Sequence, residues 1–241
     1  MVSKLNRREF LLGSFPFFWR KRPFETLDGI RFQVIRKDKS LHHYLLIHGN
    51  EETAREVLVT HMHQAKGIAY LVTGHERNVT IASGQLDPNR MFSREGAEKS
   101  LRSLNPDWSP ERLHKALHKL DHGRAKLVSR LFPPPDGRLV ALHNNSQGYS
   151  VKDEVPSSDA LSLKDADHPH EFFLCTDAGD FAILATSPYN VVFQRKMPNE
   201  DDGSLSRLAA RRGVRYINLE VTLGEKAKQV EMLGWLEAHL R

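Results

Sequence analysis

Residues 44–73, YLLIHGNEETAREVLVTHMHQAKGIAYLVT, decide the fold of this 241-residue chain. The apolar run Tyr44–Ile47 has the length and composition of a buried strand, and a glycine turn follows it. Residues 52–66 then carry apolar side chains at helical spacing up to Gly67, where a helix is expected to end. A second apolar run, Ala69–Thr73, completes an order of strand, helix and strand that is typical of an α/β sheet covered by helices.

Strand-like and helix-like segments alternate along the rest of the chain. Residues 110–131 and 224–240 show amphipathic helical patterns, and residues 150–170 are loop-rich and are expected to form a rim or lid. Several apolar runs are continuous, as in strands that are buried on both faces. We therefore predict an α/β fold with a mixed, largely parallel β-sheet flanked by helices, and its further strands are Ile30–Ile35, Leu139–Leu142, Phe172–Cys175, Phe181–Leu184, Val191–Phe193 and Tyr216–Val221.

The composition is that of an ordinary globular protein. Hydrophobic residues make up 39% and charged residues 27%, and the length is sufficient for one domain with a full core. We expect that domain to span residues 23–241. No apolar run approaches the roughly 20 residues that a membrane-spanning helix needs, so no transmembrane segment is expected. The single cysteine, Cys175, excludes an intramolecular disulfide.

The formal net charge of +5 is concentrated at the N-terminus. Residues 1–22 hold six basic side chains and one acidic side chain, whereas the rest of the chain holds 29 of each. Binding to the phosphates of a nucleic acid needs a basic surface on the folded body, and residues 23–241 have no excess of positive charge. We therefore expect no nucleic-acid partner.

Residues 6–12, Asn-Arg-Arg-Glu-Phe-Leu-Leu, resemble the start of a twin-arginine export signal, and an apolar stretch extends from them to Trp19. The stretch is short, and no cleavage site of small residues precedes residues 20–22. A disordered basic tail and a first amphipathic segment of the fold are the alternatives. The protein is accordingly expected either in the periplasm or cell envelope, by the twin-arginine route, or in the cytoplasm.

Two histidines stand at the ends of predicted strands. His48 follows Tyr44–Ile47 and precedes Glu51 by three residues, and His143 follows Leu139–Leu142. Open α/β sheets place their ligand sites at such strand ends. Two neutral imidazoles and one carboxylate form a common catalytic zinc set that leaves a fourth position open for water. We expect His48, Glu51 and His143 to bind one Zn²⁺ per chain, although each histidine would also suit the core or the surface.

Two further patterns carry polar groups suited to catalysis or binding. Glu220 lies within the apolar run Tyr216–Val221, where a carboxylate is costly to bury without a partner or a task. Near a metal-bound water it would accept a proton as a general base. Asn89 and Arg90 would hold a substrate carboxylate, because arginine binds a carboxylate with two parallel hydrogen bonds. The alternatives are a salt-bridged strand glutamate and an ordinary surface turn.

Taken in order, these motifs resemble the zinc carboxypeptidase superfamily, and most closely its aspartoacylase and succinylglutamate desuccinylase branch. Residues 48–51 (HGNE) are similar to the first metal motif of that branch, and residues 87–92 (DPNRMF) to its carboxylate-binding motif. Residues 142–144 (LHN) are similar to its third-ligand motif, and residues 219–221 (LEV) to the segment with the catalytic glutamate. Four motifs in family order are more specific than any one of them.

The resemblance implies further site residues. Members of the superfamily use an arginine upstream of the Asn-Arg pair to polarise the scissile carbonyl, and Arg77 is the candidate here, with Arg55 as the second choice. Carboxypeptidases also carry a tyrosine that contacts the substrate, ahead of the catalytic glutamate in sequence. Residues 198–204 contain no tyrosine, so Tyr149 or Tyr189 would have to take that place from a loop.

The implied activity is zinc-dependent hydrolysis of an amide bond near a free carboxylate. Glu220 would act as the base and Arg77 would polarise the carbonyl. Asn89 and Arg90 would fix which amide reaches the metal. The expected substrate is an N-acyl amino acid or the C-terminus of a peptide. The alternative is a module on the same fold that binds a ligand or peptide without catalysis.

Overall fold

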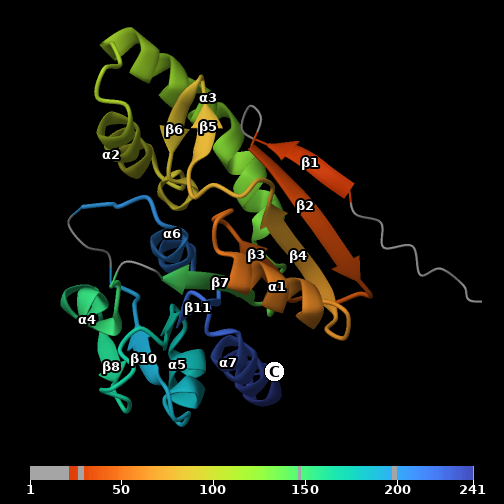
Figure 1. Ribbon diagram of the computed structural model, residues 1–241. Helices are drawn as coiled ribbons and strands as arrows, with labels where there is room; N and C mark the ends of the chain where they lie inside the picture. Colours follow the sequence, from red (N-terminus) through yellow and green to blue (C-terminus); the bar gives the residue numbers. More distant parts are fainter. Residues whose placement is uncertain (1–21, 27–29, 146–147, 197–199, 241) are drawn as a thin grey trace, which may run out of the picture.

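The computed structural model describes residues 22–26, 30–145, 148–196 and 200–240. Within these residues, nine strands form one mixed sheet in the order β1-β2-β4-β3-β7-β11-β9-β10-β8 (Figure 1). Strands β5 and β6 pair as a separate hairpin. The strands are β1 (Arg22–Thr26), β2 (Ile30–Lys37), β3 (His43–Leu46), β4 (Gly67–Val72), β5 (Val79–Ile81), β6 (Gly84–Leu86), β7 (Leu139–Asn145), β8 (Ala160–Ser162), β9 (Phe172–Cys175), β10 (Asn190–Phe193) and β11 (Tyr216–Thr222).

The centre of the sheet is parallel. Strands β4, β3, β7 and β11 all run in one direction, and the antiparallel neighbours β2 and β9 adjoin them on either side. A parallel centre gathers the carboxyl ends of β3, β7 and β11 at one edge, where ligand sites form in sheets of this kind. The predicted fold class, a mixed sheet flanked by helices, is confirmed.

Helices cover both faces of the sheet (Figure 1). Apolar residues of α1, α5 and α7 belong to the core on one face, and those of α2, α3 and α6 belong to the core on the other. The helices are α1 (Glu52–His61), α2 (Arg94–Leu104), α3 (Pro110–Leu131), α4 (Val151–Glu154), α5 (Ala178–Leu184), α6 (Leu205–Arg212) and α7 (Lys226–His239), with short 3-10 turns η1 (Pro88–Arg90) and η2 (Val155–Ser157).

Two expectations about local structure are wrong. Residues 181–184 form the end of α5 and not a strand, because Asp177 starts a helix by accepting a hydrogen bond from the Asp180 amide at 3.0 Å. A short apolar run alone does not distinguish a strand from a buried helix segment. The helix expected over residues 52–66 ends at His61.

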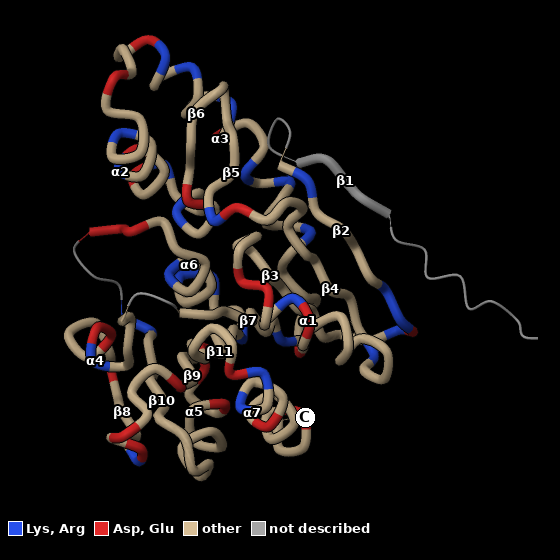
Figure 2. The backbone as a smooth tube through the Cα atoms, in the orientation of Figure 1, with Lys and Arg blue, Asp and Glu red and all other residues tan. Residues whose placement is uncertain are grey.

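Charge is distributed over the described chain without a single dominant sign. Figure 2 shows basic and acidic residues interspersed, and the acidic residues 200–202 lead directly into the basic helix α6. No helix among the described residues has the length and hydropathy needed to cross a membrane. The N-terminal segment that resembles an export signal lies outside the described residues.

Candidate metal centre and active-site cavity

Three adjacent parallel strands bring the predicted metal ligands and the predicted base together. His48 and Glu51 lie between β3 and α1, and His143 lies on β7. The register of the sheet places His143 opposite Glu220 of β11. Side chains alternate along a strand, so His143 and Glu220 share the sheet face covered by α2, α3 and α6. All four residues are buried and line one cavity.

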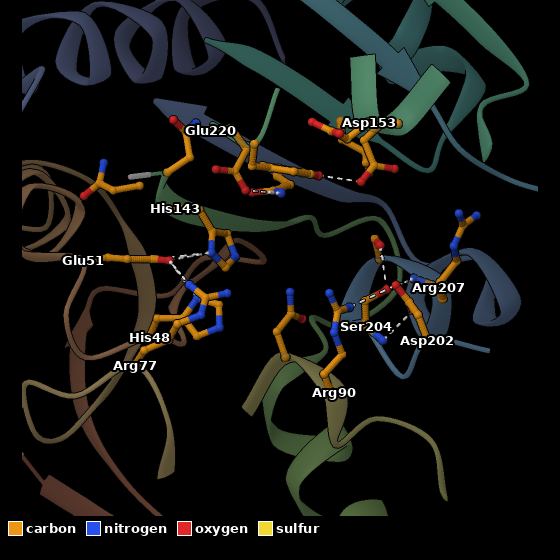
Figure 3. A pocket seen from close by; sticks show the side chains of 18 of the residues that line it. His48, Glu51, Arg77, Arg90, His143, Asp153, Asp202, Ser204, Arg207 and Glu220 are labelled. Carbon is orange, nitrogen blue, oxygen red and sulfur yellow. Dashed lines mark hydrogen bonds and ion pairs between the residues drawn. The ribbon is translucent and has the colours of Figure 1, made fainter. Parts of the chain in front are cut away.

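The two candidate histidine ligands converge on the carboxylate of the third, Glu51 (Figure 3). His48 Nδ1 lies 2.7 Å from Glu51 Oε1, and His143 Nδ1 lies 3.2 Å from Glu51 Oε2. The two imidazole rings are 5.2 Å apart between centroids. One ligand atom from each of the three residues lies within 4.8 Å of the other two, so the set forms a candidate metal site.

Asp87, which the sequence analysis noted only as part of a motif, holds the far side of the His48 ring. Asp87 Oδ1 lies 2.9 Å from His48 Nε2. When Nε2–H donates to that carboxylate, the Nδ1 lone pair of a neutral ring faces Glu51 Oε1. Two lone pairs at 2.7 Å need a proton or a cation between them. The other oxygen, Glu51 Oε2, is buried and makes no hydrogen bond with the described residues. These donors therefore fit a divalent metal.

The surroundings shift the pKa values of the two buried glutamates in opposite directions. Burial alone would raise the pKa of Glu51, but His143 and His48 outweigh it and lower that pKa to about 2. Burial raises the pKa of Glu220, and the Glu51 carboxylate adds to the effect, while His143 and a hydrogen bond from Asn218 oppose it. Burial would lower the pKa of His48, yet its acidic neighbours Glu51 and Asp87 raise it to about 9. Glu51 is thus suited to a cation and Glu220 to proton transfer.

Asn144 ties the two ligand-bearing segments to each other. Its Oδ1 accepts a hydrogen bond at 2.7 Å from the Ala54 amide in the first turn of α1, directly after Glu51. Its Nδ2 donates at 3.1 Å to Gln229 Oε1 on α7, and Gln229 Nε2 donates at 3.0 Å to the His143 carbonyl. The start of α1, and with it Glu51, is thereby fixed against the strand that carries His143.

Of the two candidate arginines, only Arg77 lies at the centre. Its guanidinium approaches Glu51 Oε1 at 3.6 Å and Asp87 Oδ2 at 3.4 Å. Arg55 instead donates to the carbonyls of Val72 at 3.0 Å and Gly74 at 3.1 Å, so it holds a loop in place.

Gly49 permits the close approach of the two loops that follow β3 and β4. Its amide donates to the Glu76 carbonyl at 3.0 Å. A Cβ atom at this position would lie 2.6 Å from that same oxygen and 2.8 Å from the Gly74 carbonyl, which is closer than real contacts allow. The absence of a side chain at residue 49 thus lets the loop with residues 74–76 pack closely against the loop after β3. Arg77, the next residue of that loop, is thereby brought beside the candidate ligands.

The centre lies at one end of a cavity of about 550 Å³ (Figure 3). The predicted substrate residues Asn89 and Arg90 are in its wall, together with Arg77. Arg90 Nη1 donates to Asp202 Oδ2 at 3.0 Å, and Asn89 Oδ1 accepts from the Leu205 amide at the start of α6 at 3.1 Å. Arg90 is thus already paired with a carboxylate of the protein.

Sequence reasoning missed several residues of this wall. Arg207 of α6 is buried, lines the cavity and donates from Nη1 to the Lys196 carbonyl at 3.2 Å. It stands among other arginines in a polar helix, so nothing in the sequence set it apart. Other wall residues that the sequence did not single out include Asp153, Glu154, Gln194, Asp202, Ser204 and Asn218.

The two candidate tyrosines lie on opposite faces of the sheet. Tyr149 lines the cavity and donates its hydroxyl to Glu154, and burial raises its pKa. Tyr189 packs against Phe173 in the core of the other face and donates at 2.7 Å to Glu231. Tyr149 is therefore the tyrosine that can meet a ligand, and it directly precedes residues 150–170, the segment expected to form a rim or lid.

No family model matches the chain, and no curated protein matches it in sequence. Solved structures similar to it include a succinylglutamate desuccinylase from Silicibacter sp. TM1040, at 14% identity and a TM-score of 0.45. A succinylglutamate desuccinylase/aspartoacylase from Rhodobacter sphaeroides is 15% identical, with a TM-score of 0.44. The ectoine utilization protein EutE (DoeB) from Ruegeria pomeroyi is 12% identical, with a TM-score of 0.42. Each match covers 87% of this chain, which spans 60%, 59% and 60% of the three structures, respectively. The first two names are those of the branch that the sequence motifs resemble.

Proposed function

We propose that the protein is a zinc-dependent hydrolase that cleaves an amide bond near a free carboxylate of its substrate. One observation carries the proposal: a buried set of two histidines and a glutamate, suited to a divalent cation, faces the same cavity as a buried glutamate and three arginines. Imidazole nitrogens favour zinc over magnesium and calcium, which prefer oxygen ligands.

His48, Glu51 and His143 would hold the metal, with Asp87 fixing the ring of His48. When bound, zinc supplies a Lewis acid that polarises a carbonyl group and acidifies water. Glu220 accepts a proton from the attacking water and returns it to the leaving amine, as the new C–O bond forms and the C–N bond breaks. Burial raises the pKa of Glu220, and a raised pKa suits a carboxyl group that accepts a proton and then returns it.

The arginines would orient the substrate. Arg77, beside the metal ligands, places its positive charge where a carbonyl oxygen gains negative charge. Arg90 would exchange Asp202 for a carboxylate of the substrate, with Asn89 beside it. An N-acyl amino acid and the C-terminus of a peptide both supply an amide near a carboxylate, so both belong in the substrate panel.

The first experiment measures the metal. Elemental analysis of the purified protein should find about one zinc per chain, and His48→Ala and His143→Ala should each lose most of it. His118→Ala is the matched control, since His118 is an exposed histidine on α3. Zinc that persists in both ligand variants would exclude this site.

The second experiment measures turnover. The zinc-loaded protein is incubated with a panel of N-acyl amino acids and short peptides, and the release of free amine is followed. Hydrolysis that disappears in both ligand variants and survives in His118→Ala supports the proposed reaction. Saturable binding of panel compounds without any hydrolysis would instead identify the chain as a binding module.

A further inference from the structure

We propose that Asn218 recognises a hydrogen-bond donor on the substrate, in the part of the cavity that extends along β11 beyond Glu220. The substrate class is then an amide whose amine-side residue carries a side-chain hydroxyl, carboxamide or ammonium group. This inference rests on the proposed hydrolase function and narrows its substrate.

Asn218 is placed to act beside the base. It lies two residues before Glu220 on β11, so both side chains project from the same face of the sheet. It is 8% exposed and lines the cavity. Its Nδ2 donates a hydrogen bond of 3.0 Å to Glu220 Oε1. The amide therefore orients the carboxylate that would move the proton.

That hydrogen bond fixes the direction of the opposite end of the amide. With Nδ2 on Glu220, the carbonyl oxygen Oδ1 points away from the carboxylate. Reversing the amide would bring Oδ1 against an ionised Glu220, so that two acceptors would meet without a proton between them. The orientation seen in the structure is thus the one that an ionised base requires.

The oxygen Oδ1 is buried and has no hydrogen-bond partner among the described residues. Buried acceptors in folded proteins are nearly always paired, and an exception calls for an explanation. Among the described residues that line the cavity, two buried side-chain atoms share this property, namely Glu51 Oε2 and Asn218 Oδ1. Glu51 Oε2 belongs to the candidate metal ligand set, and Asn218 Oδ1 is the acceptor that we assign to a donor of the substrate.

The chemistry of the base indicates which part of the substrate lies there. Glu220 must reach both the attacking water and the leaving nitrogen, so the metal ligands lie on one side of it and the amine portion on the other. On β11, Glu220 is paired with His143 of β7. Asn218 is paired with Ala141, and it lies two residues farther than Glu220 from the carboxyl end of β11. In the proposed arrangement, Asn218 borders the amine portion of the substrate. Leu174, its partner on β9, gives that region an apolar wall.

The test compares isosteric amine-side residues that differ in a donor. Threonine is compared with valine and asparagine with leucine, in otherwise identical N-acyl substrates or peptides. Wild-type kcat/KM should favour the donor-bearing member by about tenfold or more, because sites built around a hydrogen bond reject analogues that lack it. In Asn218→Leu the ratio should fall to about one, since the acceptor is gone while the size is kept. The ratio is informative because the accompanying loss of the Glu220 hydrogen bond lowers kcat for both members alike.

Two companion variants separate the roles of the side chain. Asn218→Asp keeps an acceptor and loses the donor to Glu220, so the preference should remain while kcat falls. Asn145→Leu is the matched control, because Asn145 also lines the cavity but its Nδ2 donates to the His170 carbonyl and its Oδ1 is not an unpaired buried atom. It should leave the ratio unchanged. Melting temperature and zinc content are measured for each variant, and only folded, metal-loaded variants enter the comparison.

Two results would overturn the inference. Equal kcat/KM for both members of each pair in the wild type would show that the acceptor binds only water. An unchanged ratio in both Asn218→Leu and Asn218→Ser would show that Asn218 does not recognise the substrate.

If no panel compound is hydrolysed, the proposed function fails. The inference is then tested by calorimetric binding of free threonine against valine and of asparagine against leucine. Tighter binding of the donor-bearing amino acids supports Asn218, and equal or absent binding overturns it.

Discussion

Two groups of residues in the cavity are held in opposite ways. The candidate metal ligands His48, Glu51 and His143, here called the metal end, lie at the ends of adjacent parallel strands, and they are buried and held by other buried groups. The arginine wall consists of Arg77, on a loop beside the metal end, and Arg90, in the 3-10 turn η1, and their side chains are 48% and 39% exposed. Both arginines are paired with acids of the protein itself. The metal end is fixed before a substrate arrives, whereas the arginine wall must release its acidic partners to bind a substrate.

This difference predicts where substitutions will be costly. A buried charge that loses its partner carries a large desolvation penalty, and a ligand displaced by a small distance no longer meets the metal. Exposed ion pairs contribute only about 0.2–1 kcal/mol to stability, because water screens them in either state. Changes at the metal end should therefore reduce stability or chemistry strongly, and changes at the arginine wall should chiefly alter substrate affinity.

The largest effect is expected for the base. Glu220→Gln keeps the shape of the side chain and removes its proton acceptor, so zinc should remain while kcat falls about 10²–10⁴-fold. The measurement is kcat at equal zinc occupancy on the best substrate of the panel. Glu171→Gln is the control, since Glu171 is a carboxyl whose pKa burial also raises but which does not line the cavity. A wild-type kcat in Glu220→Gln would reduce Glu220 to an ordinary strand residue.

The next effect concerns the buried amide that joins α1 to β7. Asn144→Leu leaves the Ala54 amide and the Gln229 carboxamide without their partner, which should cost about 1–3 kcal/mol of unfolding free energy. The displaced start of α1 carries Glu51 with it, so zinc affinity should also fall, by roughly 10–100-fold as for other residues that support metal ligands. Chemical denaturation and a zinc titration measure the two losses. Lower stability with unchanged zinc affinity would show that Asn144 does not position Glu51.

A smaller effect is expected at the arginine wall. Arg90→Ala should raise KM about tenfold with little change in kcat, because a carboxylate clamp acts in both the ground state and the transition state. The effect should nearly vanish for a substrate analogue in which an amide replaces the carboxylate. Steady-state kinetics on the matched pair of substrates gives the result. A collapse of kcat with KM unchanged would place Arg90 in the chemical step instead.

The exposed partner of Arg90 supplies the control with the smallest effect. Asp202→Asn removes the competing carboxylate, so KM should fall or stay constant, and stability should change by less than about 1 kcal/mol. If Asp202→Asn raised KM as much as Arg90→Ala, the Asp202–Arg90 pair would be a structural clamp and not a displaceable one.

Much of the parallel centre of the sheet was predictable because its strands are continuous apolar runs. The runs around residues 44–47, 139–142 and 216–221 all became strands of that centre. The strand predicted at residues 181–184 was wrong because four apolar residues suit a buried helix equally well. The N-cap at Asp177 favours the helix over the strand. Helices α2 and α6 were missed, since both are polar segments that are held by contacts distant in sequence, such as the bond from the Leu205 amide to Asn89.

The sequence by itself determined which residues meet at the centre. A histidine or glutamate that ends or interrupts an apolar strand is visible locally, and parallel strands bring such positions to one edge. Only the tertiary structure placed Arg77, and not Arg55, beside the candidate ligands, and Tyr149, and not Tyr189, in the cavity wall. It also placed Asp87 beside His48 and left the Asn218 side-chain oxygen without a hydrogen-bond partner in the described part of the chain. Strand periodicity is a property of neighbouring residues, whereas burial and hydrogen-bond pairing depend on segments that meet only when the chain has folded.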